Sequence, residues 1–107
     1  MSSINFLGEI VDLDTNSIKD LLFQLRTETE NFIGIIGNTE QDKCALSLII
    51  SENLCQEKNL NASQIIREIS KHIQGGGGGQ SFFATAGGKR KEGLKEAIAG
   101  VKNLFHN

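Results

Sequence analysis

Proline, tryptophan and tyrosine are absent from the 107-residue sequence, and six phenylalanines are its only aromatic residues. Without Trp and Tyr, the chain lacks two of the side chains that most often anchor protein–protein interfaces. No apolar run reaches the roughly 18 residues that a membrane-spanning helix needs. The N-terminal segment shows neither the basic start nor the apolar core of a signal peptide. We therefore expect a cytoplasmic protein with no membrane partner.

Cysteine and histidine are scarce, with two residues of each. Cys44 and Cys55 could form a disulfide, but without a secretion signal they are more typical of reduced cytosolic thiols. The spacing of these cysteines and of His72 and His106 does not match a zinc site. The acidic residues are scattered, whereas a metal-dependent hydrolase needs clustered Asp and His ligands. We therefore expect no metal, no cofactor and no catalytic residue in this chain.

Charge is unevenly distributed along the chain, although the net charge is only −2. Residues 1–66 carry four Lys or Arg and ten Asp or Glu, whereas residues 67–107 carry seven Lys or Arg and three Glu. These counts correspond to balances of −6 and +4, so an anionic partner is expected in the C-terminal part. From charge alone, the alternative is a mixed, solvated surface with no partner.

Apolar residues recur with strand and helix periods, which predicts a single domain over residues 1–107 with an α/β fold of the α+β kind. Ile18, Leu21 and Leu22 lie on one face of the first predicted helix. Asn61 begins a capping box at the start of the second. We expect a mixed β-sheet with helices packed on it. The predicted order is strand 4–11, helix 17–27, strand 31–37, strand 43–51, helix 62–74, a glycine-rich loop and helix 91–105.

The most informative stretch is the glycine-rich segment 75–89, which begins with five consecutive glycines. Ordering five glycines costs much conformational entropy, and they bring no side chains to pack. Such a run is useful where a partner approaches the backbone closely, and successive N–H groups can bind anions. A flexible linker is the alternative, although the run lies between two patterned helices rather than at a domain boundary.

Three cations follow the glycines, at the start of the last predicted helix. The N-terminus of a helix adds partial positive charge to them. Together with the bare backbone they predict a platform that contacts phosphates. The predicted nucleic-acid-binding residues are Gly75, Gly76, Gly77, Gly78, Gly79, Gln80, Phe82, Phe83, Ala86, Gly87, Gly88, Lys89, Arg90 and Lys91.

Phe82 and Phe83 are adjacent, so in an extended segment their side chains point in opposite directions. One ring is then expected in the core, and the other is free to stack on a base. The alternative is that both rings pack between helix and sheet.

Known nucleotide-binding motifs do not fit this segment. In a Walker A loop the first glycine would fall on Phe83, and Lys89 would be followed by Ser or Thr rather than Arg90. A dinucleotide fingerprint requires a preceding strand, but the glycines follow a predicted helix and lack the third glycine at Gln80. ATP and NAD are therefore not expected as ligands.

The glycine run, the sequence Ala86-Gly87-Gly88-Lys89 and the final amphipathic helix resemble the C-terminal domain of bacterial alanyl-tRNA synthetases. That domain is similar to the DHH-associated domain of a phosphoesterase superfamily. The resemblance is most specific over residues 61–105. The phosphoesterase relatives place a His after their glycines, where this chain has Gln80, which favours the synthetase branch. Many synthetases have Pro-Asp-Met where this chain has Ser81-Phe82-Phe83.

The resemblance implies a tRNA-binding module that contacts the outer corner of alanine-specific tRNA, where the D and T loops meet. In the family this domain supports aminoacylation and editing by a parent ligase that uses ATP, Mg²⁺ and Zn²⁺ in other domains. The implied partners are tRNA and those other domains, and the chain itself is not expected to be an enzyme. The alternatives are a protein-interaction or homodimerisation domain of the synthetase, or a free-standing nucleic-acid-binding domain.

Overall fold

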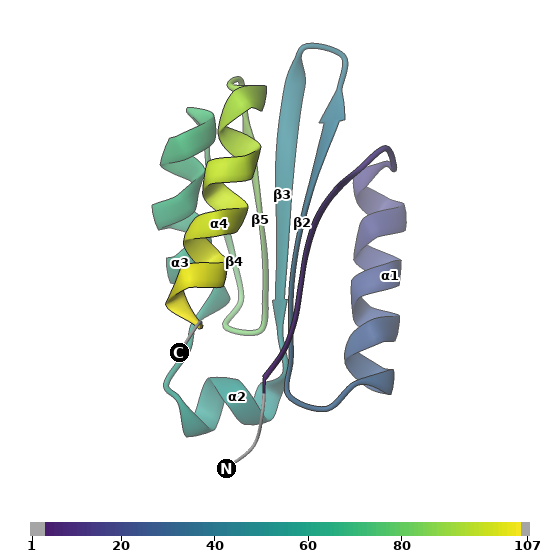
Figure 1. The fold of residues 1–107 in the computed structure, drawn as a ribbon, viewed down its shortest axis with the longest axis vertical. Helices are drawn as coiled ribbons and strands as arrows, with labels where there is room; N and C mark the ends of the chain where they lie inside the picture. The colour runs from purple at the N-terminus through teal and green to yellow at the C-terminus, as the bar shows by residue number, and fades with distance from the viewer. Residues whose placement is uncertain (1–3, 106–107) are drawn as a thin grey trace.

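The computed structural model describes residues 4–105, which form one mixed β-sheet with helices on both faces (Figure 1). The strands are β1 (Asn5–Val11), β2 (Phe32–Glu40), β3 (Lys43–Ile50), β4 (Gly76–Gly79) and β5 (Phe83–Gly88). The helices are α1 (Thr15–Glu28), α2 (Glu52–Glu57), α3 (Ala62–Ile69) and α4 (Leu94–Leu104), with 3₁₀ turns η1 (Ser70–Ile73) and η2 (Lys91–Gly93).

The strand order is β1-β2-β3-β5-β4, so β1 and β4 form the two edges of the sheet. β1 pairs parallel with β2, and all other pairs are antiparallel. The parallel pair is joined through α1, and β2 and β3 form an antiparallel hairpin. The mixed α+β architecture expected from the sequence is therefore confirmed.

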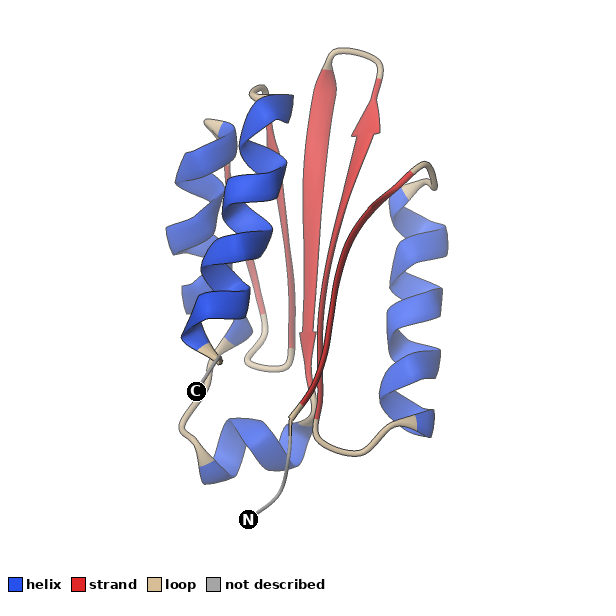
Figure 2. Ribbon diagram, viewed as in Figure 1, coloured by secondary structure: helices blue, strands red, loops and turns tan. Residues whose placement is uncertain are grey.

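The helices divide between the two faces of the sheet (Figure 2): α1 covers one face, and α3 and α4 cover the other. Strand residues alternate between these faces, as their period of two requires. On the α1 side, Ile36 and Ile49 pack against Ile18 and Leu22. Under α3 and α4, the core residues from the sheet are Ile33, Ile35, Cys44, Leu46, Leu48, Ile50, Ala84 and Ala86.

Side-chain hydrogen bonds cap the N-termini of two helices. Asn61 accepts a hydrogen bond from the Gln64 backbone N–H at 3.3 Å, which confirms Asn61 as the cap and supplies one of the two bonds of the predicted capping box. Asp14 accepts from the Ser17 N–H at 2.6 Å, and this bond lowers the pKa of the Asp14 carboxyl. Along the predicted apolar face of α1, Ile18 and Leu22 are fully buried, whereas Leu21 is 37% exposed.

Three elements differ from the prediction. The short helix α2 was not expected, because its six residues are too few to show a helical period. The last helix begins at Leu94, after η2. Gly93, the last residue of η2, packs so closely that a Cβ atom there would lie 1.8 Å from the His72 carbonyl oxygen. The prediction of a glycine-rich loop is wrong, because Gly76–Gly79 form the edge strand β4.

Cys44 and Cys55 are both free thiols, and burial raises the pKa of each, so they stay protonated near neutral pH. Among residues 4–105, no three His, Cys, Asp or Glu side chains lie close enough together to bind a metal ion. His106 lies outside the described residues. Every helix described is too short or too polar to span a lipid bilayer.

Candidate nucleic-acid interface

The glycine segment is held in place at both ends, so the flexible-linker alternative is wrong. At its start, the Gly75 N–H donates to the Ser70 carbonyl at 3.0 Å. At its end, the Gln80 N–H donates to the Phe83 carbonyl at 2.8 Å and closes a tight turn between β4 and β5. The two strands form a glycine hairpin (residues 76–88) at one edge of the sheet.

The turn of the glycine hairpin is also tied to the rest of the domain. The Ser81 carbonyl accepts from the Ala62 N–H at 2.8 Å and from the Cys55 thiol at 3.2 Å. The Phe82 carbonyl accepts from the Ile50 N–H at 2.8 Å. Cys55 therefore helps to position the turn, a role that its sequence context does not indicate.

Four glycines of the segment leave no room for a side chain, and we call them the packed glycines (Gly75, Gly77, Gly79 and Gly88). A Cβ atom on Gly77 would lie 2.0 Å from the Thr85 carbonyl oxygen. The nearest backbone oxygen would lie 1.9 Å from such an atom on Gly75, 2.5 Å on Gly79 and 2.3 Å on Gly88. Real Cβ atoms do not approach other atoms this closely, so the packed glycines are required by the close approach of backbone to backbone.

Three other glycines of the hairpin have room for a side chain, and we call them the open glycines (Gly76, Gly78 and Gly87). A Cβ atom on Gly76 would meet nothing within 4 Å, and one on Gly87 only the Cys44 carbonyl at 4.0 Å. On Gly78 its nearest neighbour would be the Ser63 hydroxyl at 3.7 Å, an ordinary contact. Gly76 and Gly87 are cross-strand partners. They form a stretch of bare backbone that the fold itself does not require.

The outer edge of β4 offers unpaired backbone groups. In an antiparallel ladder, hydrogen-bonded pairs alternate with non-hydrogen-bonded ones. Counting from the bonded Gln80–Phe83 pair, Gly78 and Gly76 are bonded to β5. The N–H and C=O groups of Gly77 and Gly79 therefore point away from the sheet. Both glycines are exposed, so these groups can accept a partner.

Of the three predicted cations, only Lys89 is exposed without a side-chain contact among the described residues. The Arg90 guanidinium donates to the His72 carbonyl at 3.1 Å and pairs with Glu96 at 3.4 Å. The Lys91 ammonium donates to the Gln41 carbonyl. Arg90 and Lys91 therefore hold the last helix against η1 and the β2–β3 turn.

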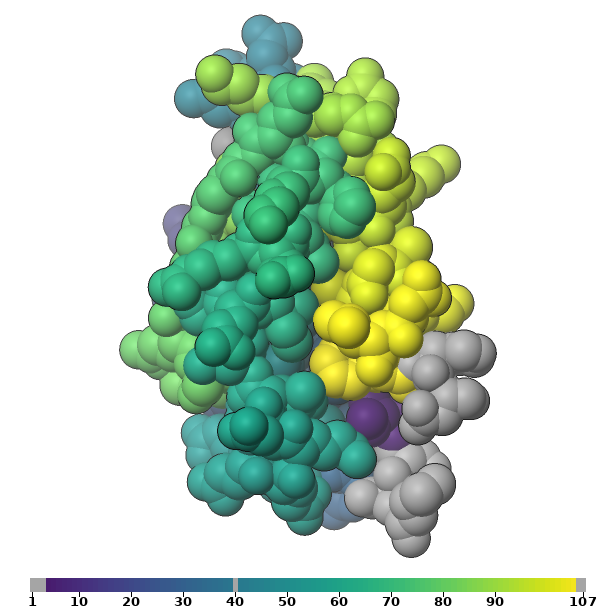
Figure 3. Space-filling model, turned by 90° about the vertical axis from the view of Figure 1, so that its left-hand side faces the viewer, coloured from purple at the N-terminus to yellow at the C-terminus, as the bar shows by residue number. Residues whose placement is uncertain are grey.

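One cation that was not predicted as part of the site, Arg67, lies beside β4. On Gly78, a Cβ atom would lie 4.0 Å from the Arg67 guanidinium. Arg67 and Lys71 line one shallow depression on α3 and η1, together with Gln64 and the carboxylate of Glu68. The spacing of four residues between Arg67 and Lys71 places them on one helix face, which is a signal that the sequence does carry. In Figure 3 the green hairpin forms the rim of the molecule beside the teal surface of α3.

The remaining predicted residues differ in accessibility. Gln80 is exposed at the turn, but Ala86 is buried under α3 and α4. Phe82 and Phe83 are both half-buried, and both rings contact Phe23 of α1. The expectation that the two rings point in opposite directions is wrong, because Phe82 belongs to the turn rather than to the extended strand.

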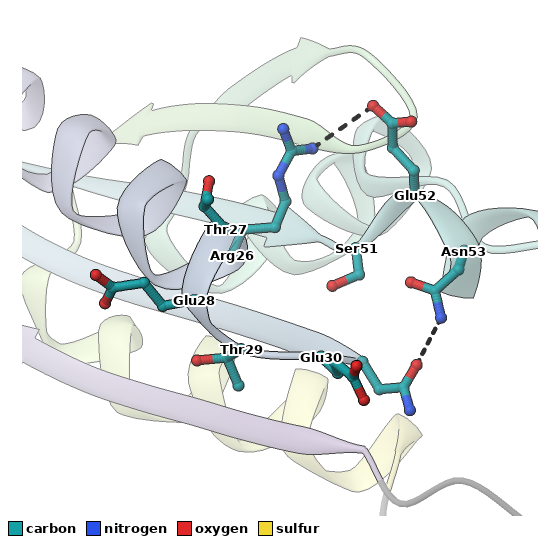
Figure 4. A pocket seen from close by; sticks show the side chains of 9 residues that line it. Arg26, Thr27, Glu28, Thr29, Glu30, Ser51, Glu52 and Asn53 are labelled. Carbon is teal, nitrogen blue, oxygen red and sulfur yellow. Dashed lines mark hydrogen bonds and ion pairs between the residues drawn. The ribbon is translucent and has the colours of Figure 1, made fainter.

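A larger cavity, of about 710 Å³, lies at the end of α1 and is unsuited to phosphate (Figure 4). Its lining includes the carboxylates of Glu28, Glu30 and Glu52. Its one cation, Arg26, lies 3.9 Å from Glu52. This cavity therefore does not suit an anionic ligand.

Comparison with known proteins supports the resemblance seen in the sequence. Residues 3–107 match the DHHA1 domain family. The chain is 52% identical to an alanine–tRNA ligase of Christiangramia forsetii over 98% of its length, and 46% identical to that of Parabacteroides distasonis over 92%. It spans only 12% and 11% of those two proteins.

A solved structure has the same fold over the whole chain. The C-Ala domain of Aquifex aeolicus alanyl-tRNA synthetase superposes with a TM-score of 0.84 at 25% sequence identity. The match covers 100% of this chain and 97% of that domain. The chain therefore belongs to the DHHA1 domain family.

Proposed function

We propose that this chain is the tRNA-binding domain of an alanine–tRNA ligase and contacts the outer corner of the tRNA through its glycine hairpin. The relatives that it matches carry that enzyme name, and the C-Ala domain shares its fold. The parent ligase would use ATP, Mg²⁺ and Zn²⁺ in domains outside this chain, in the cytoplasm. This domain would bring tRNA to those centres rather than act on it.

The open glycines are the observation on which this proposal depends. Glycine in a strand costs about 0.5–1 kcal/mol relative to alanine. At Gly76 and Gly87 no steric need offsets that cost. A surface that needs bare backbone is one that a bulky partner approaches closely, as the sugar–phosphate backbone of folded RNA does.

The charges around the hairpin support an anionic partner. Lys89 follows β5, and Arg67 lies beside β4. Lys71 lines the same depression as Arg67, where Glu68 is the one carboxylate among the described lining residues. The outward N–H groups of Gly77 and Gly79 add hydrogen-bond donors for phosphate oxygens. Contacts of this kind give position and affinity rather than base specificity.

The test is a titration of the chain with alanine-specific tRNA at several salt concentrations. Release of counterions predicts that affinity falls steeply as salt rises. A tRNA that lacks the loop–loop corner is expected to bind about tenfold more weakly or worse. Salt-independent binding, or equal binding of the cornerless tRNA, would contradict the proposal.

A second candidate is contact with other domains of the ligase or with a second copy of the chain. A groove of about 870 Å³ runs between β1 and α4, at the opposite edge of the sheet. Phe6 and Ile98 form its floor, and Ile10 beside them is 42% exposed. Sedimentation without RNA tests this function: self-association that Ile10→Glu abolishes would support a homodimer, and a monomer would exclude one for the isolated chain.

A further inference from the structure

Helix α1 presents a second stripe of side chains beside its core stripe. Lys19, Phe23 and Arg26 follow the helical spacing and lie toward the glycine hairpin rather than under the helix. The Phe23 ring lies 5.0 Å from the Phe83 ring and 6.4 Å from the Phe82 ring, centroid to centroid. Helix α1, although remote in sequence, therefore forms a wall of side chains beside the turn of the glycine hairpin.

Cations flank this aromatic cluster. The Arg26 guanidinium lies 5.0 Å from the centroid of Phe23 and 5.2 Å from that of Phe82. The Lys19 ammonium lies 5.9 Å from the centroid of Phe83. Lys19 is exposed, so it can still reach a phosphate.

A cavity of about 350 Å³ opens between this wall and the turn. Gly78 and Gly79 also line it, so bare backbone and aromatic rings border the same opening. Gln80 and Thr85 add side-chain polar groups at the rim. None of the described residues that line it carries a carboxylate, in contrast to the cavity at the end of α1.

We propose that this cavity takes one unpaired nucleobase of the bound RNA, stacked on the Phe23–Phe82–Phe83 cluster, with Lys19 on an adjacent phosphate. Its volume lies at the lower end of the roughly 300–1,000 Å³ range of ligand pockets, which suits a single planar ring system. Aromatic platforms with nearby cations are the usual means of holding unstacked bases. The inference rests on the proposed function and adds α1 to the RNA-binding surface.

A double-mutant cycle between protein and RNA tests the base pocket. Phe23→Leu is expected to weaken tRNA binding about tenfold, the effect of losing one stacked base. The unpaired nucleotides of the tRNA corner are then made abasic one at a time. At one position the abasic tRNA should bind about tenfold more weakly to the wild-type chain and lose its sensitivity to Phe23→Leu, because both changes remove one contact.

Two further variants keep the result interpretable. Phe6→Leu, the same substitution at the opposite edge of the sheet, is expected to leave tRNA affinity unchanged. Lys19→Gln changes an exposed residue and is expected to reduce the slope of log affinity against log salt by about one. If Phe23→Leu fails to fold, as thermal unfolding will show, an unchanged slope in Lys19→Gln overturns the inference.

The outcomes separate this inference from the proposed function. Salt-dependent tRNA binding with no coupling at any abasic position would contradict the base-pocket proposal but support the tRNA-binding function. If the wild-type chain binds no tRNA, both the base-pocket proposal and the tRNA-binding function are contradicted.

Discussion

At Gly77 a Cβ atom would lie 2.0 Å from a carbonyl oxygen of the neighbouring strand, whereas at Gly76, one residue earlier, it would meet nothing within 4 Å. Both residues belong to one uninterrupted run of glycine, yet they lack a side chain for different reasons. Gly75, Gly77 and Gly79 leave room for the backbone of residues 83–87, and Gly88 leaves room for the Ile73 carbonyl. The open glycines face no such contact, and we propose that they lie where a partner approaches.

The largest expected effect comes from substituting a packed glycine. Gly77→Ala should lower the free energy of unfolding by about 3 kcal/mol, because its methyl group collides with the backbone of β5. Gly76→Ala should instead be neutral or stabilise by up to about 1 kcal/mol, since it restricts the unfolded chain without a clash. Urea unfolding of the two variants measures the difference. Equal destabilisation by both would abolish the distinction between the two sets of glycines.

The cations at the two ends of the Lys89–Lys91 run offer a similar contrast. Lys89→Ala should reduce the salt slope of tRNA binding by about one, because it removes one phosphate contact. Lys91→Ala should leave the slope nearly unchanged, since that ammonium already donates to the Gln41 carbonyl. Lys102→Ala, on the far side of the domain, is the matched control. A larger effect for Lys91 than for Lys89 would move the RNA contact to the helix start.

The smallest expected effect concerns the cap of α1, remote from the glycines. The pKa of Asp14 is lowered in the folded state by its bond to the Ser17 N–H, so its ionised form stabilises the fold. That contribution is complete above the unfolded value of 3.8 and is lost as pH falls through the lowered folded value. Asp14→Asn should therefore lower Tm slightly at pH 7, and the difference should shrink as pH falls further below 3.8. A Tm difference that stays constant as pH falls would show that charge is not involved.

Much of the fold could be predicted from periodicity. The helix cap at Asn61 and the buried stripe at Ile18 and Leu22 give clear local signals, and the structure confirms them. The strand β4 gives none, because glycine has no side chain to alternate and a low preference for strands. Its formation depends on tertiary contacts, such as its pairing with β5, in which Gly76 lies opposite Gly87.

The site was predictable in composition but not in detail. The sequence identifies the glycines and the cations, but it does not separate Gly76 from Gly77, since that difference depends on how closely β5 approaches. Nor does it show that Arg90 is held by Glu96 and the His72 carbonyl. The contribution of α1 to the hairpin wall depends on the packing of Phe23 against Phe83, which are 60 residues apart in sequence.

The most direct test is the tRNA affinity of Gly76→Val, measured beside its stability. The valine side chain fits the space around Gly76 and suits a strand, so we expect a folded domain at least as stable as the wild type. The added methyl groups should hold RNA away from the edge of β4 and weaken tRNA binding about tenfold or more. Unchanged affinity in this folded variant would show that the bare backbone serves some purpose other than the approach of RNA.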